Sequence, residues 1–384
     1  MINKGDIRVL VIDDSAYNRR VLSEMLSSEP GIVVVGKACD GEEGLQLAIS
    51  QKPDVITLDL EMPRMDGFAL LRILMAKRPI PVIVISAYAE KEKVFRALEL
   101  GALDFVAKPT ARISPSIQEI RREVIKKVKL ARALRPDSIC PASAYYPIED
   151  TPPPKTRTKK QESSGRKPGP NLKAAARSAM PSYGTAAAPR KETRSRSVVA
   201  LAASTGGPTS LTRILTTFSE DIDAAIIVVQ HMPPRFTTTF AERLNRQCAI
   251  RVTEVTGEEP LLGGVAYVAS GDACLEVRPD DNGLIVSAVP PAPGDRYVPS
   301  ASRLFSSLAG VAGKDALAVV LTGMGDDGSS GASDIAAAGG TVVAESESTA
   351  VVFGMPKAAI DTGLVTHVAP LYKIPAIIGE FIDM

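Results

Sequence analysis

The chain has 384 residues, 45% of them hydrophobic, and a formal net charge of +1. This length and composition predict two or more domains with buried cores. No apolar run reaches membrane-spanning length and no signal-peptide core is found, so we expect a soluble cytoplasmic protein rather than a membrane-spanning or secreted one. The cysteines stand singly at positions 39, 140, 248 and 274. Their spacing predicts free thiols and argues against a disulfide framework or a zinc site.

Charge is distributed unevenly along the chain. Residues 1–135 carry 22 basic and 18 acidic side chains, residues 136–196 carry 12 and 5, and residues 197–384 carry 11 and 21. The net charges of these three segments are therefore +4, +7 and −10. An acidic C-terminal part is a poor candidate for contacting a phosphate backbone, so we expect no nucleic-acid partner.

Residues 5–130 alternate short apolar runs with segments of helical period. The expected strands are Ile7–Ile12, Ile32–Val35, Val55–Leu58, Val82–Ile85 and Phe105–Val106. This fivefold alternation predicts a doubly wound α/β domain, in which helices cover both faces of a five-stranded parallel sheet.

Polar side chains follow these strands where they end. They are Asp13 and Asp14 after the first strand, Asp59 after the third, Ser86 after the fourth and Lys108 after the fifth. A hard divalent cation such as Mg²⁺ relieves the repulsion among three gathered carboxylates and lets Asp59 attack a phosphoryl donor. Ser86 and Lys108 would then hold the phosphoryl oxygens. Solvated surface acids are the alternative interpretation.

This set of residues resembles the receiver domain of response regulators. The resemblance is carried by Asp13-Asp14, by Thr57-Leu58-Asp59-Leu60-Glu61-Met62-Pro63-Arg64-Met65-Asp66-Gly67, by Ser86-Ala87 and by Lys108-Pro109. It implies that a histidine kinase phosphorylates Asp59, and that Mg²⁺ is held by Asp13, Asp14, Asp59 and the backbone carbonyl of Glu61. It also implies that Phe105 is the aromatic residue that switches on phosphorylation.

Residues 131–195 have the composition of a linker. They are rich in proline and basic residues and lack hydrophobic periodicity, for instance in Thr151-Pro152-Pro153-Pro154. Such a segment cannot build a packed core. The positive net charge of this segment has three interpretations. The segment is a solvated linker, it contacts an acidic partner or nucleic acid, or it lies against the acidic C-terminal part.

The C-terminal part, residues 196–384, is organised around a strand and a turn near its start. The apolar run at 198–203 ends in Ser204-Thr205-Gly206-Gly207-Pro208, and helical spacing follows. This pattern predicts a buried strand, a sharp turn and a helix, with Ser204 where backbone N–H donors concentrate. Ser204 is either a nucleophile whose oxyanion those donors stabilise or a turn residue that caps the helix.

Two later strand ends favour the nucleophile. One apolar run ends in His231, and another is followed by Asp327. In open α/β sheets the C-terminal ends of the strands share one edge, so Ser204, His231 and Asp327 can meet there as a catalytic triad. A lone histidine is more often structural, which is our interpretation of His367.

Other features leave alternatives open. The pair Gly206-Gly207 would serve a nucleotide-binding output domain as a phosphate cradle, but the turn is too short for a P-loop and no G-x-G-x-x-G follows. A DNA-binding output domain is disfavoured by the acidic balance and by the lack of a helix-turn-helix pattern. Arg296 and Ser300, which precede an expected helix, either bind an acidic substrate or cap and tether the chain.

The segment 196–384 resembles the chemotaxis protein-glutamate methylesterase family, whose receiver–linker–catalytic order the whole chain shares. The segments that carry the resemblance are residues 203–208, 230–234, 321–328 and 351–357. It implies a second doubly wound α/β domain, with Ser204, His231 and Asp327 as the triad and Thr205 and Met324 shaping the oxyanion site.

The resemblance also implies an activity and its partners. The substrates would be glutamate methyl esters on methyl-accepting chemoreceptors, with deamidation of receptor glutamines beside them and no cofactor for hydrolysis. A chemotaxis histidine kinase would be the phosphodonor, and the receptors would be the only link to the membrane. Because a receiver domain and a catalytic domain share one chain, we expect the receiver to cover Ser204 until Asp59 is phosphorylated.

Two residues depart from the family pattern. Asp326 stands where members often have asparagine, so two adjacent acids compete for the triad role, and the motif favours Asp327. Ser270 stands where proline is common, which predicts a local change in that loop.

Overall fold

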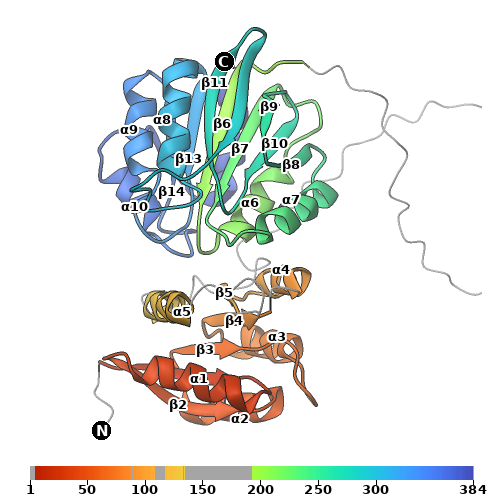
Figure 1. Cartoon of the computed structure of the whole chain (residues 1–384), viewed down its shortest axis with the longest axis vertical. Coiled ribbons are helices and arrows are strands. Elements are labelled where there is room, and N and C mark those ends of the chain that lie inside the picture. Colours follow the sequence, from red (N-terminus) through yellow and green to blue (C-terminus); the bar gives the residue numbers. More distant parts are fainter. Residues whose placement is uncertain (1–4, 88–89, 109–116, 133, 135–192, 384) are drawn as a thin grey trace, which may run out of the picture.

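The computed structural model describes residues 5–87, 90–108, 117–132, 134 and 193–383. Most of the predicted linker at 131–195, together with Cys140 and Pro109, therefore lies outside the described residues. The other three cysteines, Cys39, Cys248 and Cys274, are free thiols, as the sequence predicts. The described residues form an N-terminal domain, β1 to α5, and a C-terminal domain, β6 to α11 (Figure 1).

The N-terminal domain is the predicted five-stranded parallel sheet, in the order β2-β1-β3-β4-β5. Its strands are β1 (Ile7–Ile12), β2 (Ile32–Ala38), β3 (Val55–Leu58), β4 (Val82–Ser86) and β5 (Asp104–Ala107), and its helices are α1 (Ala16–Ser27), α2 (Gly41–Gln51), α3 (Gly67–Lys77), α4 (Lys91–Glu99) and α5 (Ile117–Arg132). Strands β3 and β4 are buried along their whole length, because helices cover both faces of a doubly wound sheet.

The C-terminal domain is built on seven parallel strands in the order β15-β14-β13-β6-β7-β10-β8. The strands are β6 (Ser197–Ala203), β7 (Ala224–Gln230), β8 (Arg251–Val255), β10 (Val265–Ala269), β13 (Ala316–Val320), β14 (Thr341–Glu345) and β15 (His367–Ala369). The helices are α6 (Gly207–Leu215), α7 (Phe236–Gln247), α8 (Ala301–Ala312), α9 (Ser329–Ala337), α10 (Met355–Ile360) and α11 (Ile374–Ile382), with 3₁₀ turns η4 (Gly313–Asp315) and η5 (Leu371–Lys373).

The central strand β6 shows why this sheet needs two helical layers. Its side chains alternate between the faces, so Leu201 packs with α6 and α7 while Ala200 and Ala202 pack with α8 and α9. All of β6 beyond its first residue is buried. The expected doubly wound architecture is therefore confirmed for the C-terminal domain.

A small antiparallel sheet, which the sequence analysis did not predict, joins the C-terminal domain. It consists of β9 (Glu258–Pro260), β11 (Cys274–Asp280) and β12 (Gly283–Val289), in the order β11-β12-β9. Strand β11 packs on α8. The loop after β12 leads to α8 and carries Tyr297 and Ser300 to the edge of the main sheet.

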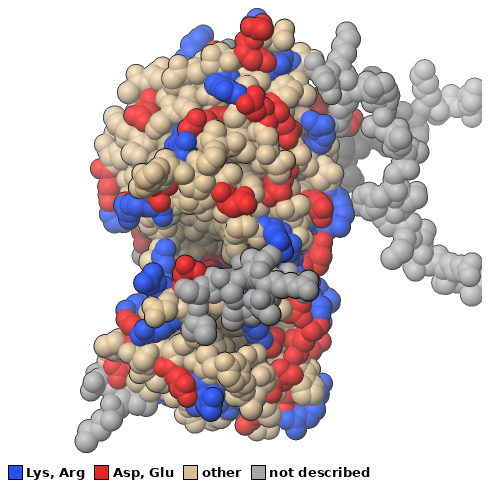
Figure 2. Space-filling view, viewed as in Figure 1, with Lys and Arg blue, Asp and Glu red and all other residues tan. Residues whose placement is uncertain are grey.

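The two domains meet through α4, β5 and α5 on the N-terminal side (Figure 1). Phe95 stacks on Phe240 with 5.5 Å between ring centroids, and Phe105 lies 4.6 Å from Phe236. On the rim, Arg243 of α7 forms ion pairs with glutamates of α4. Figure 2 shows a hollow at this boundary, with blue side chains gathered beside it over α5. The contact therefore has an aromatic centre and a charged rim.

Candidate active site

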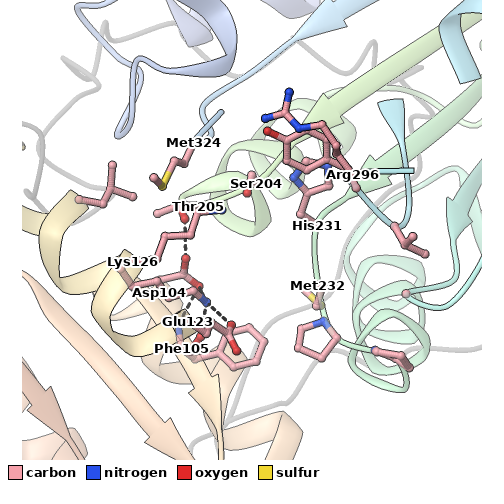
Figure 3. A pocket seen from close by; sticks show the side chains of 17 residues that line it. Asp104, Phe105, Glu123, Lys126, Ser204, Thr205, His231, Met232, Arg296 and Met324 are labelled. Carbon is pink, nitrogen blue, oxygen red and sulfur yellow. Dashed lines mark hydrogen bonds and ion pairs between the residues drawn. The ribbon is translucent and has the colours of Figure 1, made fainter. Parts of the chain in front are cut away.

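The three predicted triad residues lie at one edge of the C-terminal sheet. Strands β13, β6 and β7 are neighbours, and Ser204 and His231 directly follow β6 and β7. Ser204 N–H donates to the carbonyl of Thr322 at 3.0 Å, and His231 N–H donates to that of Ala203 at 3.0 Å. Both side chains line a cavity of about 350 Å³ (Figure 3). The parallel topology thus brings together residues that are far apart in sequence.

Asp327 is the carboxylate that contacts His231. Its Oδ2 lies 2.8 Å from His231 Nε2 and accepts a bond from Ala301 N–H at 2.7 Å. Its Oδ1 accepts from Ser302 N–H at 2.9 Å and from Ser300 Oγ at 3.2 Å. Burial alone would raise the pKa of Asp327, but the bond from His231 and these backbone donors at the start of α8 outweigh it and lower the pKa. Asp327 is therefore held ionised beside the imidazole.

Asp326 points elsewhere. Its Oδ1 accepts a hydrogen bond from Tyr297 Oη at 2.8 Å, and its Oδ2 pairs with Arg296 at 3.1 Å. The hydrogen bond from Tyr297, helped by Arg296, lowers the pKa of Asp326. Of the two adjacent acids, only Asp327 contacts the histidine.

Ser204 does not cap α6. The N-cap residue is Gly206, in a left-handed conformation with φ of 82°, and no side chain caps this helix. In the part of the chain that the structure describes, no hydrogen bond joins Ser204 Oγ to His231. Because Nε2 of His231 faces Asp327, Nδ1 is the ring nitrogen left for the serine.

Two buried polar residues that the sequence analysis missed hold the turn around Ser204. Gln230 Nε2 donates to the carbonyls of Ser204 at 2.9 Å and His231 at 3.0 Å. Thr322 Oγ1 donates to the carbonyl of Thr205 at 2.9 Å. Their signal in the sequence is a polar residue at the end of an otherwise apolar strand.

Close packing explains why position 207 is a glycine. A Cβ atom at Gly207 would lie 2.0 Å from Gln230 Oε1, so only glycine fits there. The side of each glycine on which a Cβ atom would stand is filled by protein, so packing accounts for the glycine pair without a phosphate.

Thr205 and Met324, the predicted oxyanion-site residues, line the same cavity (Figure 3). Thr205 Oγ1 donates to Asp104 Oδ2 of the N-terminal domain at 2.5 Å. Asp104 also binds Lys127 of α5, with 3.0 Å between its Oδ1 and the lysine Nζ. The N-terminal domain thus contacts the residue next to Ser204.

The predicted loop residues have ordinary structural partners. Ser300 accepts a hydrogen bond from Arg303 N–H and is the N-cap of α8, so it caps the helix and tethers Asp327. Ser270 Oγ donates to Asp272 Oδ1 at 2.7 Å within its own loop. His367 is the exposed first residue of β15 and is not among the residues that line the cavity.

The predicted phosphoryl site lies at the edge of the other sheet. One carboxylate oxygen from each of Asp13, Asp14 and Asp59 lies within 4.8 Å of the others. Lys108 Nζ lies 2.5 Å from Asp59 Oδ2 and 3.0 Å from Asp13 Oδ2. Burial raises the pKa of Asp59 to about 6, and the bond from Lys108 only partly offsets this.

The donor set of this site fits a hard cation. Asp13 Oδ2 is buried, and no described residue donates a well-aligned hydrogen bond to it, although the ammonium of Lys108 is near. Carboxylate oxygens are the ligands that Mg²⁺ prefers. Of the other predicted residues, Ser86 Oγ donates to Glu90 at 2.8 Å, and the side chain of Glu61 pairs with Lys93.

Comparisons with known proteins identify a family for each of the two domains. Residues 199–378 match the model of the CheB methylesterase family, and residues 9–115 match that of the response regulator receiver domain. A protein-glutamate methylesterase/protein-glutamine glutaminase of Myxococcus xanthus is 44% identical over 97% of this chain and 96% of its own. One of Geobacter sulfurreducens is 46% identical over 96% and 95%.

The chain belongs to the protein-glutamate methylesterase/protein-glutamine glutaminase family. Among solved structures, the catalytic domain of Thermotoga maritima CheB methylesterase is 36% identical, with a TM-score of 0.46, over 49% of this chain and 97% of that one. Within the described residues, no helix is long and apolar enough to span a membrane. The predicted resemblance to this family is thus confirmed along nearly the whole chain.

Proposed function

We propose that the chain hydrolyses glutamate methyl esters of methyl-accepting chemoreceptors and deamidates receptor glutamines. One observation carries the proposal: Ser204 and His231 line one cavity while the buried Asp327 holds the imidazole at 2.8 Å. A serine, a histidine and a carboxylate in this relation form an acyl-transfer site. The family membership of the chain supports the choice of ester and amide substrates.

The proposed reaction passes through an acyl-enzyme. His231 removes the proton of Ser204 Oγ, and the oxygen attacks the ester carbonyl. The tetrahedral intermediate collapses, the C–O bond to the methoxy group breaks, and His231 returns the proton so that methanol leaves. Water then gives a proton to the same histidine and attacks the acyl-enzyme. The bond between the acyl carbon and Ser204 Oγ breaks, His231 returns the proton to Oγ, and the product leaves as a glutamate carboxylate after losing its own proton to solvent. With a glutamine substrate, the leaving group is ammonia.

Each supporting group has a defined task in this scheme. Asp327 accepts from Nε2–H of His231, which leaves Nδ1 as the base and stabilises the imidazolium that forms. Backbone N–H groups at the turn between β6 and α6 stabilise the oxyanion, and Thr205 and Met324 shape the space around it. Ser204 and His231 are not hydrogen-bonded in the described structure, so the two side chains would approach one another before attack.

The N-terminal domain would accept a phosphoryl group from the chemotaxis histidine kinase. Asp59 is the acceptor, Ser86 and Lys108 hold the phosphoryl oxygens, and Asp13, Asp14, Asp59 and the carbonyl of Glu61 would hold Mg²⁺. When bound, the cation neutralises charge that develops on the transferred group. The kinase and receptor substrates would make the enzyme cytoplasmic and bound to the membrane only through receptors. The linker at 131–195 would join the two functions.

The unphosphorylated arrangement is proposed to block the substrate. Asp104, Phe105 and Lys126 of the N-terminal domain line the same cavity as Ser204. A receptor side chain that reached Ser204 would therefore have to displace this domain. Phe105 also touches Phe236, so a movement of this switch residue on phosphorylation would loosen the contact.

Methanol release from methylated receptor is the direct test. We expect release by the unphosphorylated chain, faster release with a small phosphodonor, and no stimulation in Asp59→Asn. The matched control is Asp54→Asn, which changes an acid outside the carboxylate cluster. Methanol release at the wild-type rate by Ser204→Ala would overturn the proposed function, and release without phosphodonor stimulation would overturn the proposed regulation alone.

A further inference from the structure

The aromatic ring of Tyr297 lies flat against the imidazole of His231. The two ring planes differ by 2°, and their centroids are 5.0 Å apart. Tyr297 stands in the loop between β12 and α8 and lines the same cavity as Ser204. The separation is in the range of favourable stacked pairs. The histidine is therefore held by a second group besides Asp327.

Tyr297 is itself fixed on two sides. Its Oη donates to Asp326 Oδ1 at 2.8 Å, and the guanidinium of Arg296 lies 5.4 Å from its ring centroid. Gly325 has a φ of 101°, and a Cβ atom there would lie 2.4 Å from Tyr297 Oη. The loop after β13 therefore accommodates the tyrosine only because this position is glycine.

We propose that Tyr297, anchored by Asp326, is a positioning residue that fixes the ring plane of His231 and stabilises its protonated form. The proposal rests on the hydrolysis proposed above, in which the imidazole is charged during both acyl transfers. It assigns a task to Asp326, the acid that the triad does not use.

The geometry explains why Asp327 alone is insufficient. A hydrogen bond to Nε2 fixes one direction within the imidazole plane but leaves the ring free to tilt about that bond. A flat aromatic face against the ring removes this tilt, so that Nδ1 stays directed at the serine side of the cavity. The face of an aromatic ring also attracts a cation. Because Tyr297 Oη donates its hydrogen bond to the carboxylate of Asp326, the ring is more electron-rich. Both effects favour the imidazolium.

Other charged groups also face His231 and must be kept constant in a test. Asp327 and Arg296 belong to the C-terminal domain. Asp104, Glu123, Lys126 and Lys127 line the cavity from the N-terminal domain. Every variant is therefore compared in the full chain and in the same phosphorylation state, so that the contribution of these groups is unchanged.

The two-histidine composition of the chain provides a readout that does not depend on catalysis. His367 is exposed, outside the cavity, and His367→Gln leaves His231 as the single histidine. In this background, isotope-labelled histidine gives one imidazole signal, whose chemical shift is followed against pH. We expect Tyr297→Leu to move the midpoint of this titration to lower pH by about 0.5 unit, because the aromatic face is lost.

Three further variants separate the contribution of the Tyr297 ring from that of its hydrogen bond to Asp326. Tyr297→Phe keeps the stacked ring, so its titration midpoint should stay close to that of the parent chain. Asp326→Asn should also move the midpoint only slightly, because an acceptor for Tyr297 Oη remains. Tyr297→Asn is made beside Tyr297→Leu as a second ring deletion in case the latter does not fold, as judged by thermal melting. In ester hydrolysis, the acidic limb of the kcat/KM profile should move with the titration.

The outcomes distinguish the two proposals. An unchanged titration midpoint in the folded ring-deletion variant overturns the positioning role, even if kcat falls, because a merely structural loss would not move the midpoint selectively. A wild-type chain that releases no methanol would overturn the proposed hydrolysis, while the titration result would still decide the role of Tyr297. A lowered midpoint restored by Tyr297→Phe supports the proposal.

Discussion

Asp59 in the N-terminal domain and Asp327 in the C-terminal domain occupy equivalent places, each buried at the C-terminal edge of a parallel sheet, but burial affects them differently. It raises the pKa of Asp59 to about 6, whereas the pKa of Asp327 is lowered despite burial. Asp59 accepts bonds from Lys108 and from one backbone N–H. Asp327 has His231 and three backbone N–H donors.

The difference shows how one residue type serves two purposes. Enough fixed donors keep a buried carboxylate ionised, and such a group is ready before any ligand arrives. A buried carboxylate with fewer donors is stabilised when a cation binds to it or when it is covalently modified. The C-terminal site is thus complete within the protein, while the N-terminal site has oxygen ligands to spare.

The largest effect should come from breaking the preorganised site at its nucleophile or base. We expect Ser204→Ala and His231→Ala each to lower kcat for methyl-ester hydrolysis by about 10³-fold or more, because nucleophile and base act as one unit. Steady-state methanol release measures this. Ser219→Ala and His367→Gln, both exposed and outside the cavity, should leave kcat unchanged. Near-normal turnover in a folded Ser204→Ala chain contradicts the triad.

The next effect concerns the two adjacent acids. Asp327→Asn should lower kcat by roughly 10²- to 10⁴-fold, because the amide cannot hold the imidazole in the required tautomer and its NH₂ group would meet donors at the start of α8. Asp326→Asn should cost less than about tenfold, since it keeps an acceptor for Tyr297 Oη. The matched pair is compared by kcat at constant pH. The reverse ranking would show that the wrong acid has been assigned to His231.

The sequence predicted that these residues lie near one another, because parallel strands bring their C-terminal ends together whatever their separation along the chain. The five N-terminal strands and the positions of Ser204 and His231 at strand ends follow from this rule. Contacts that depend on side-chain reach were not predicted. Examples are the stacking of Tyr297 on His231, the clamp by Gln230, and Thr205 with Asp104, which are 101 residues apart.

A smaller effect should follow from weakening the contact between the domains. Arg243 forms ion pairs with Glu92 and Glu99 of α4. Arg243→Glu would turn these attractions into repulsion, and we expect unphosphorylated hydrolysis to rise by about 2- to 10-fold. Stimulation by a phosphodonor should shrink to the same degree, as measured by methanol release with and without it.

The control for this change is Arg278→Glu, which breaks a surface ion pair with Glu258 on the small antiparallel sheet. It should leave both basal and stimulated rates unchanged. If Arg243→Glu loosens the domains, as judged by hydrogen exchange in α4 and α7, yet basal hydrolysis stays at the wild-type level, coverage of Ser204 does not limit the enzyme. The N-terminal domain would then act chiefly by recruitment.

The last expected effect concerns stability instead of rate and extends the comparison to a third buried carboxylate, Glu345. Among the described residues, two donate hydrogen bonds to it: Thr322 N–H at 2.8 Å and Thr349 Oγ1 at 2.9 Å. Burial raises its pKa to about 7, and these two donors do not offset the loss of water. With fewer donors than Asp327, Glu345 should be protonated in much of the folded protein near neutral pH.

The sign of the pH dependence follows from this raised pKa. The folded chain binds the proton more tightly than the unfolded one, so the contribution is complete below the ordinary pKa of 4.5 and is lost as pH rises through about 7. Between pH 5 and pH 8 the free energy of unfolding should fall by about 2 kcal/mol more in wild type than in Glu345→Gln. Glutamine can accept from Thr322 and donate to Thr349, so the variant should fold. The free energy of unfolding is measured at each pH by urea denaturation, with hydrogen exchange of β13 and β14 as the probe. Glu380→Gln, at an exposed position, is the control. If the free energy of unfolding changes equally with pH in wild type and in Glu345→Gln, fixed donors and not burial decide the charge of Glu345 too.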